Sequence, residues 1–260
     1  MYFEVKNKRR ITILQNNKYI FGRNPIREKL KIIKTGILFI KKGIKTSTIQ
    51  DIIKKSKSKN IQILFIDNKK FDHQFKEKNH QGLALKINEN YTELLSFDDF
   101  LNKIKKQKET RSTIIILDGI NDVGNFGAIL RSALMFDVNG VILPKNNSTP
   151  INDIVIKSSA GAVFQLDIIY VTNIVRTIHE LKKIGYWIYA SDKSGENISK
   201  INFNDKSVII FGSENKGIRQ LVKENCDYTV SINTNKKLDS LNLSVSAGIV
   251  LYEMTRNNFS

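Results

Sequence analysis

Cysteine, histidine and long apolar runs are scarce in this sequence, and each scarcity excludes a class of protein. Cys226 is the only cysteine, which rules out an intramolecular disulfide and fits a reducing, cytoplasmic compartment. We expect it to be a packed apolar side chain rather than a nucleophile. The three histidines have no cysteine, histidine or carboxylate at ligand spacing, so we expect no metal site. No apolar run approaches eighteen residues and no signal-peptide pattern begins the chain, so we expect neither a membrane span nor a leader.

Acidic residues are scarce in the N-terminal part of the chain. The sequence carries 42 Lys/Arg and 25 Asp/Glu, a net charge of +17. Residues 1–110 hold 26 basic and 11 acidic residues, whereas the remaining 150 hold 16 and 14. A coding bias toward lysine would have raised the charge of both parts. The asymmetry therefore predicts an N-terminal module that binds a polyanion, with nucleic acid as the leading candidate.

Hydrophobic periodicity divides the chain into four parts. Residues 1–17 form a basic arm, and alternating strand and helix patterns over 18–98 predict a small α/β domain. Residues 99–110 begin in a helical pattern and become charged, which we interpret as a linker. Residues 111–260 predict a parallel sheet with helices on both faces, whose ligand loops follow the strands. The strands expected in this last part cover 113–117, 140–143, 186–190, 208–211 and 228–232, and the helices 125–136, 151–158, 172–184, 217–224 and 242–256.

Residues 113–133 form the first of three distinctive stretches. A run of Ile and Leu, typical of a strand buried on both faces, breaks into a glycine-rich turn and restarts with helical spacing. Asn125 stands where we expect the helix N-cap, and Arg131 lies beside the apolar stripe of the helix. This pattern indicates a phosphate-binding loop at a helix N-terminus, although most such turns are only tight turns.

Two later stretches have the same character. In 208–222 a buried strand ends in Gly212, Ser213 and Glu214, and Gly217 precedes the next helix. In 239–253 small polar residues begin an apolar helix. Each residue also has a purely structural interpretation: Glu214 can be a solvated turn carboxylate, Asn242 an N-cap and Arg131 a surface arginine.

Taken together, the three stretches resemble a known family. NDVGNFGAILRSA (121–133), GSENKGI (212–218) and SLNLSVSAG (240–248), in this order, resemble the three motifs of the SpoU group of RNA 2'-O-ribose methyltransferases, within the SPOUT superfamily. Further matches are KSSAGAVF (157–164), FGRNPIREKL (21–30) and NHQGL (79–83). The resemblance covers nearly the whole chain, and three ordered motifs are far more specific than one glycine loop.

The resemblance implies a fold and a set of partners. It implies a C-terminal SPOUT domain with a deep trefoil knot that binds S-adenosylmethionine, and an N-terminal substrate-binding domain with a ribosomal-protein (L30e-like) fold. It also implies a homodimer whose active sites lie at the subunit interface. The N-terminal domain and its NHQG signature resemble the branch that modifies a guanosine of large-subunit ribosomal RNA.

The resemblance also assigns residues. The cofactor-binding set is Gly212, Ser213, Gly217, Ile232 and Leu241, and the catalytic set is Asn125, Arg131, Glu214, Ser240 and Asn242. A ribose hydroxyl that attacks an activated methyl group needs positioning rather than a metal or a protein nucleophile. Since a guanidinium stays protonated, we assign Arg131 to hold phosphate and ribose and to stabilise the developing alkoxide. The proton acceptor is left unassigned.

One stretch departs from the family pattern, and alternatives stay open. The family usually has proline after the isoleucine of the third motif, with methionine and glycine close behind, but here the sequence is INTNKK (232–237). The alternatives are a transfer RNA 2'-O-methyltransferase and a non-catalytic RNA-binding factor for ribosome assembly. A dinucleotide-dependent oxidoreductase is disfavoured, because no G-x-G-x-x-G with a following acidic residue is found.

Overall fold

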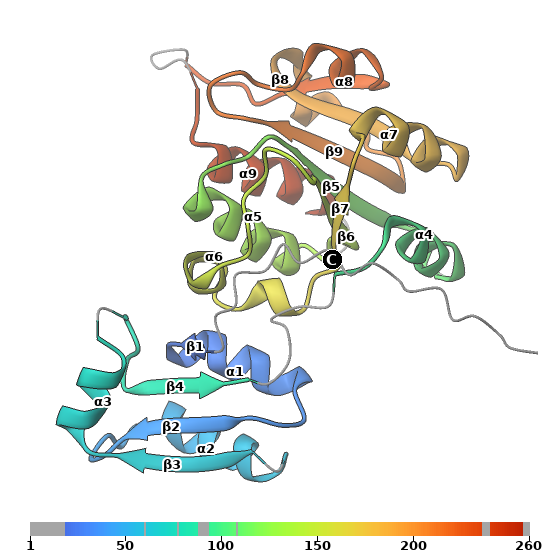
Figure 1. Cartoon of the computed structure of the whole chain (residues 1–260). Coiled ribbons are helices and arrows are strands. Elements are labelled where there is room, and N and C mark those ends of the chain that lie inside the picture. The colour runs from blue at the N-terminus through green and yellow to red at the C-terminus, as the bar shows by residue number, and fades with distance from the viewer. Residues whose placement is uncertain are drawn as a thin grey trace, which may run out of the picture.

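The strands of the described chain form two separate sheets (Figure 1). The structure is a computed structural model that describes residues 19–59, 61–76, 78–87, 94–107, 109–235 and 240–256. The predicted basic arm, residues 1–17, lies outside the described residues. Among the described helices, none is long and apolar enough to cross a membrane.

The N-terminal unit is a small mixed sheet with helices, as predicted. Its strands follow the order β1-β4-β2-β3, with β2 and β3 parallel and β4 antiparallel to both neighbours. Its elements are β1 (Tyr19–Phe21), α1 (Arg23–Ile32), β2 (Ile37–Lys41), α2 (Ser47–Lys57), β3 (Gln62–Ile66), α3 (Asn68–Gln74) and β4 (Leu83–Lys86). The sequence had not predicted β1, because three residues are too few to show a period of two.

The NHQGL segment forms a tight turn before β4. Gln81 and Gly82 both have positive φ, and the Gly82 amide donates a hydrogen bond of 3.0 Å to His80 Nδ1. Gly82 has a φ of 80°, a conformation that residues with a side chain rarely adopt, and a Cβ there would lie 2.0 Å from Ile44 Cδ1, so this turn strongly favours glycine. The imidazole of His80 also packs edge-on against Phe71. His80 therefore closes a turn, and the described residues contain no His, Cys, Asp and Glu group that could hold a metal ion.

The second unit is an all-parallel sheet in the order β10-β8-β9-β5-β6-β7. Its strands are β5 (Ser112–Asp118), β6 (Gly140–Pro144), β7 (Ile168–Val171), β8 (Trp187–Asn197), β9 (Lys206–Gly212) and β10 (Tyr228–Ser231). Its helices are α4 (Phe97–Lys106), α5 (Val123–Met135), α6 (Asp153–Ser158), α7 (Ile174–Lys183), α8 (Gln220–Glu224) and α9 (Leu243–Thr255), and the 3-10 turns η1 (Ala162–Phe164) and η2 (Ile198–Lys200) accompany them. The sequence had not predicted β7 or the extension of β8 beyond residue 190.

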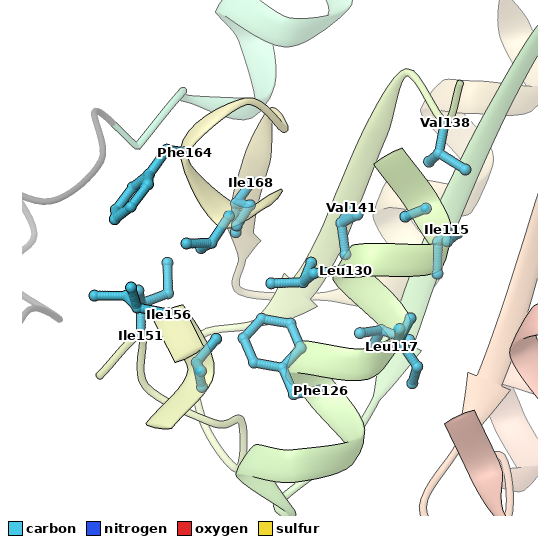
Figure 2. Close-up of a cluster of buried hydrophobic side chains, with 14 of the residues drawn as sticks. Ile115, Leu117, Phe126, Leu130, Val138, Val141, Ile151, Ile156, Phe164 and Ile168 are labelled. Atoms are coloured by element: carbon cyan, nitrogen blue, oxygen red, sulfur yellow. The ribbon is translucent and has the colours of Figure 1, made fainter. Parts of the chain in front are cut away.

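The central strand β5 is buried on both faces, which explains its unbroken apolar run. On one face of the sheet, Ile115 and Leu117 pack in the same cluster as buried residues of α5 and α9. Figure 2 shows Phe126 and Leu130 of α5 beside them. Ile114 and Ile116 pack on the other face, which α4 and α7 cover (Figure 1). Strands of a parallel sheet that is covered on both faces typically show such β-branched runs.

The helix α4 occupies most of the stretch that we interpreted as a linker, residues 99–110. Phe100 is fully buried against the second sheet, where a Cβ on Gly140 would lie 2.4 Å from its ring. The Ser96 hydroxyl caps the helix by accepting a hydrogen bond from the Asp99 amide. We therefore place α4 with the second unit, and the exact domain boundary stays a proposal.

The helix α1 rests on the KSSAGAVF segment of the second unit. Gly161 has a φ of 88°, and a Cβ there would lie 2.8 Å from Glu28 Cβ. The Lys29 ammonium lies 5.1 Å from the centre of the Phe164 ring, and Gln165 Nε2 donates to Glu28 at 2.7 Å. This match is therefore a contact between the two units rather than a separate ligand motif.

The trefoil knot stays a prediction. The chain passes from β10 to α9 through residues 236–239, which lie outside the described residues. The parallel order of the six strands supports the expected α/β class.

Candidate active site

The three motif segments meet at the carboxyl edge of the second sheet. The first follows β5, the second follows β9, and the third leads into α9. The strands β6 and β7 lie on one side of β5, and the later strands β8, β9 and β10 lie on the other, so the strand order reverses at β5. Ligands of open parallel sheets bind at such points, so this edge is the expected place for a site.

Asp122, and not Asn125, caps the helix α5. The Asp122 carboxylate accepts a hydrogen bond of 2.6 Å from the Asn125 backbone amide, and the helix begins at Val123. Our prediction of Asn125 as the N-cap was wrong, because aspartate caps as well as asparagine and the helix starts two residues earlier. The consequence is that the Asn125 side chain is free for other contacts.

Three predicted catalytic residues form one chain of hydrogen bonds. Asn125 Nδ2 donates to Glu214 Oε1, and Asn242 Nδ2 donates to Asn125 Oδ1 at 3.0 Å. Each bond joins residues of different motifs, 89 and 117 positions apart. Since both ends of the Asn125 amide are engaged, its orientation is fixed and Glu214 is held by one carboxylate oxygen. We call these residues the amide chain.

Asn242 also has the structural role that we considered for it. Its Oδ1 accepts hydrogen bonds from the backbone amides of Ser244 and Val245, at 2.9 and 3.3 Å, and caps α9. Its Nδ2 is then left to reach Asn125. One side chain therefore both starts the helix and joins the third motif to the first.

The second motif is a tight loop that closes on itself. Ser213 and Gly217 exchange backbone hydrogen bonds of 3.1 and 2.8 Å, and the Ser213 hydroxyl accepts from the Lys216 amide. Gly217 has a φ of 66°, and a Cβ on Gly212 would lie 2.0 Å from the Gly217 carbonyl carbon. Both glycines are therefore required by the loop itself. The helix α8 starts at Gln220, three residues later than predicted, because Gly217 belongs to this loop.

The remaining cofactor-binding candidates, Ile232 and Leu241, follow β10 in the chain. Ile232 directly follows β10 and is half-buried against the core, whereas Ser240 and Leu241 are exposed just before α9. In the sheet, β8 separates β10 from β9. Gly212 and Ile232 thus lie about two strand spacings apart, roughly 10 Å.

Arg131 lies apart from the amide chain. It is exposed on α5, six residues after Asn125, which places it about 9 Å along the helix axis and about 240° around it. Within the described part of the chain it forms no hydrogen bond or ion pair. Glu214 accepts its hydrogen bond from Asn125 and not from Arg131.

Asp118, which is buried, forms an ion pair with the exposed Arg219 that sequence reasoning missed. Arg219 Nε and its backbone amide donate to the two oxygens of Asp118, at 2.8 and 3.0 Å, and the Asp118 side chain is 1% exposed. The pair ties the segment after the second motif to the end of β5. A lone aspartate at the end of an apolar strand was the available signal, but its partner is 101 positions away.

A cavity of about 550 Å³ opens beside the amide chain. Its lining comes from the residues that follow β5, β6 and β9, together with Leu243 at the start of α9. Glu214 and Asp118 both contribute to the wall. The carboxyl edge therefore has an open volume next to its polar residues.

Cys226 takes no part in this site. It is half-buried behind α8, where its thiol donates to the Val222 carbonyl at 3.3 Å, and burial raises the pKa of the Cys226 thiol to about 12. Such a thiol is almost entirely protonated at neutral pH and is a poor nucleophile. It has the packing role that we expected.

The fold and this edge define an α/β protein with a ligand site at the carboxyl ends of parallel strands. The family described as the SpoU rRNA methylase family matches residues 112–252, and the one described as RNA 2'-O ribose methyltransferase substrate binding matches residues 19–92. The chain belongs to the SpoU family of RNA methyltransferases.

Two bacterial relatives match over most of their length. A tRNA/rRNA methyltransferase of Borreliella burgdorferi, named as uncharacterized, is 40% identical over 84% of this chain and 96% of its own. A protein of Staphylococcus aureus with a provisional TrmH family tRNA/rRNA methyltransferase name is 37% identical over 91% of this chain and 95% of its own.

Solved structures share the fold at low sequence identity. An RNA 2'-O ribose methyltransferase has a TM-score of 0.74 at 21% identity, over 93% of this chain and 89% of its own. The SpoU methyltransferase AviRb of Streptomyces viridochromogenes, in complex with the cofactor AdoMet, has a TM-score of 0.71 at 18% identity, over 92% and 90%.

Proposed function

We propose that this protein transfers a methyl group from S-adenosylmethionine to a ribose 2'-hydroxyl in structured RNA. The observation that carries the proposal is the amide chain, which joins Glu214, Asn125 and Asn242 from three separate motifs at a ligand-binding edge. The family descriptions for both units and the AdoMet named with AviRb support it. A degenerate, purely RNA-binding relative would have no need to keep these contacts.

The cofactor fits the edge between β9 and β10. We assign its binding to Gly212, Ser213, Gly217, Ile232 and Leu241. The Ser213 hydroxyl is already engaged with Lys216, so this segment would contribute backbone groups, while the exposed Leu241 side chain would pack on the adenosine. S-adenosylmethionine supplies an activated methyl group when bound. No protein nucleophile or metal is then required.

The amide chain and Arg131 would position the acceptor. Because Asn125 holds one oxygen of Glu214, the other oxygen can accept a hydrogen bond from the incoming hydroxyl or orient the cofactor. The Arg131 fork would hold the adjoining phosphate and stabilise the developing alkoxide. Ser240, exposed beside Leu241, would add a hydroxyl donor.

A homodimer would bring Arg131 to this site. The helix α9 is apolar on both sides: Ala247, Val250 and Leu251 are buried, yet Val245, Ile249 and Tyr252 are 50, 38 and 58% exposed. Met135 at the end of α5 extends this stripe and is 70% exposed. A helix that is apolar all round is normally buried, so we propose that a second copy covers the stripe. Arg131 of one copy would then face the amide chain of the other.

The proposed substrate is a guanosine of large-subunit ribosomal RNA. The basic N-terminal unit and its NHQG turn support this choice. The relatives carry names that combine tRNA and rRNA, so transfer RNA is the second candidate. The cytoplasmic location also stays a prediction.

The test supplies the purified protein with radiolabelled S-adenosylmethionine and separate ribosomal and transfer RNA pools. We expect label in large-subunit ribosomal RNA. The labelled methyl group should map to a ribose 2'-oxygen, because the phosphodiester bond next to a methylated ribose resists alkaline cleavage. The Asn125→Ala variant serves as the low-activity control. Label in transfer RNA alone would select the second candidate, and label on a base, or in neither pool, would overturn the proposal.

A further inference from the structure

The cavity at the carboxyl edge borders the proposed cofactor segment, because Ser213 and Gly217 of the second motif belong to its lining. Its walls follow β5 and β6, at Gly119–Asp122 and Asn146–Asn147, and the second motif closes it. The proposed cofactor contacts at Ile232 and Leu241 do not belong to its lining. A volume of about 550 Å³ lies within the usual range for small-molecule pockets, which easily hold a nucleoside.

Unpaired amides distinguish the lining of this cavity. The side chains of Asn121, Asn146, Asn147 and Asn215 all line it, and within the described residues none of them makes a hydrogen bond. A carboxamide offers a donor pair and an acceptor side by side, which matches the hydrogen-bonding edge of a nucleobase. By contrast, the side-chain amides of Asn125 and Asn242 already form hydrogen bonds within the protein.

The charges of the lining favour an uncharged group over a phosphate. Asp118 is neutralised by Arg219, Asp122 caps α5, and Glu214 is bound by Asn125. The two lining carboxylates that form no ion pair within the described residues, Asp122 and Glu214, would repel a phosphate inside the cavity. Lys216 forms no ion pair within the described chain and is exposed, so a flanking phosphate can stay outside beside it.

We propose that this cavity receives the base of the acceptor nucleoside and that Asn146 and Asn147 select that base. This assignment rests on the proposed function and names the part of the protein that sets its substrate. With the base in the cavity, the ribose lies at its mouth beside Glu214. In-line attack then requires the methyl donor, held by Ile232 and Leu241 outside the cavity lining, to lie opposite the acceptor hydroxyl.

The test uses Asn146→Ala and Asn147→Gly, alone and combined. Asn147 has a φ of 57°, so glycine removes the amide without straining the backbone. Asn102→Ala, at an exposed asparagine of α4, is the matched control. Transcripts carry each of the four bases at the acceptor position mapped with the wild type. The measurements are kcat/KM for each transcript and the Kd of S-adenosylmethionine by calorimetry.

We expect each pocket variant to lose roughly 3- to 10-fold in kcat/KM for the native base, the usual effect of one lost hydrogen bond. The preference over the other three bases should narrow, while the S-adenosylmethionine Kd stays within about two-fold. If the variants stay active and their base preference does not change, the assignment of the cavity to the base is wrong, but the proposed function still holds. Loss of cofactor binding would assign the cavity to the cofactor instead. A wild type that methylates no RNA would overturn the proposed function, and this assignment with it.

Discussion

Asn125 and Arg131 lie on the same helix and belong to the same motif, but their surroundings differ completely. Asn125 is bound on both sides, to Glu214 and Asn242, whereas Arg131 has no partner within the described chain. The difference shows that one copy of the chain builds a fixed polar centre but leaves Arg131, the cation that we propose for catalysis, outside it. The natural explanation is a site completed by a second copy.

Replacing Arg131 should have the largest effect. Loss of a charged group that stabilises a developing oxyanion costs roughly 10²- to 10³-fold, so Arg131→Ala should reduce kcat/KM by at least that amount. The S-adenosylmethionine Kd should not change, because Arg131 is not among the residues that we assign to the cofactor. Arg131→Lys, which keeps the charge but loses the planar fork, should recover little. Retained turnover in Arg131→Ala would refute the assignment.

Mixing two inactive variants separates a shared site from a site within one copy. If Arg131 acts across the dimer, equal amounts of Arg131→Ala and Asn125→Ala subunits, unfolded and refolded together, should restore about a quarter of the wild-type sites. Each mixed dimer then contains one intact site. No recovery, with mixed dimers shown by differential tagging, would place Arg131 and Asn125 in the same copy.

Placing a charge on the exposed stripe of α9 should break the dimer and, through it, the activity. Ile249→Glu would bury a carboxylate in an apolar contact, so we expect a monomer at micromolar concentration and methylation reduced at least about 10-fold. Leu221→Glu is the control, because Leu221 is 63% exposed on α8, away from the stripe. Sedimentation measures the mass and circular dichroism checks the fold. A dimeric Ile249→Glu variant would show that this stripe is not the interface.

Replacing Cys226 should have the smallest effect, because Cys226 belongs neither to the amide chain nor to the surroundings of Arg131. Cys226→Ala should keep methyl transfer within about two-fold. With a thiol pKa of about 12, the thiolate fraction at pH 8 is on the order of 10⁻⁴ and rises only as the pH approaches that value. Ellman's reagent should therefore label the native protein far more slowly than the protein in guanidinium. Rapid native labelling with loss of activity would contradict this role.

The regular elements could be predicted because their signals are local. The buried run of β5, the stripe of α5 and the Gly82 turn each follow from residues close in sequence. The strands β1 and β7 are too short to show a period of two. We partly assigned α4 to a linker because its last turn is charged, although its Phe100 is buried.

The sequence alone determined the α/β class, the order of the three motifs and the uneven charge, because composition and periodicity are properties of neighbouring residues. Only the tertiary structure decided which motif residues meet. Asn125 contacts Glu214 and Asn242, Asp118 contacts Arg219, and Arg131 contacts none of them. These outcomes depend on strand order and on the direction in which a helix presents each side chain. No local pattern encodes contacts between residues about a hundred positions apart.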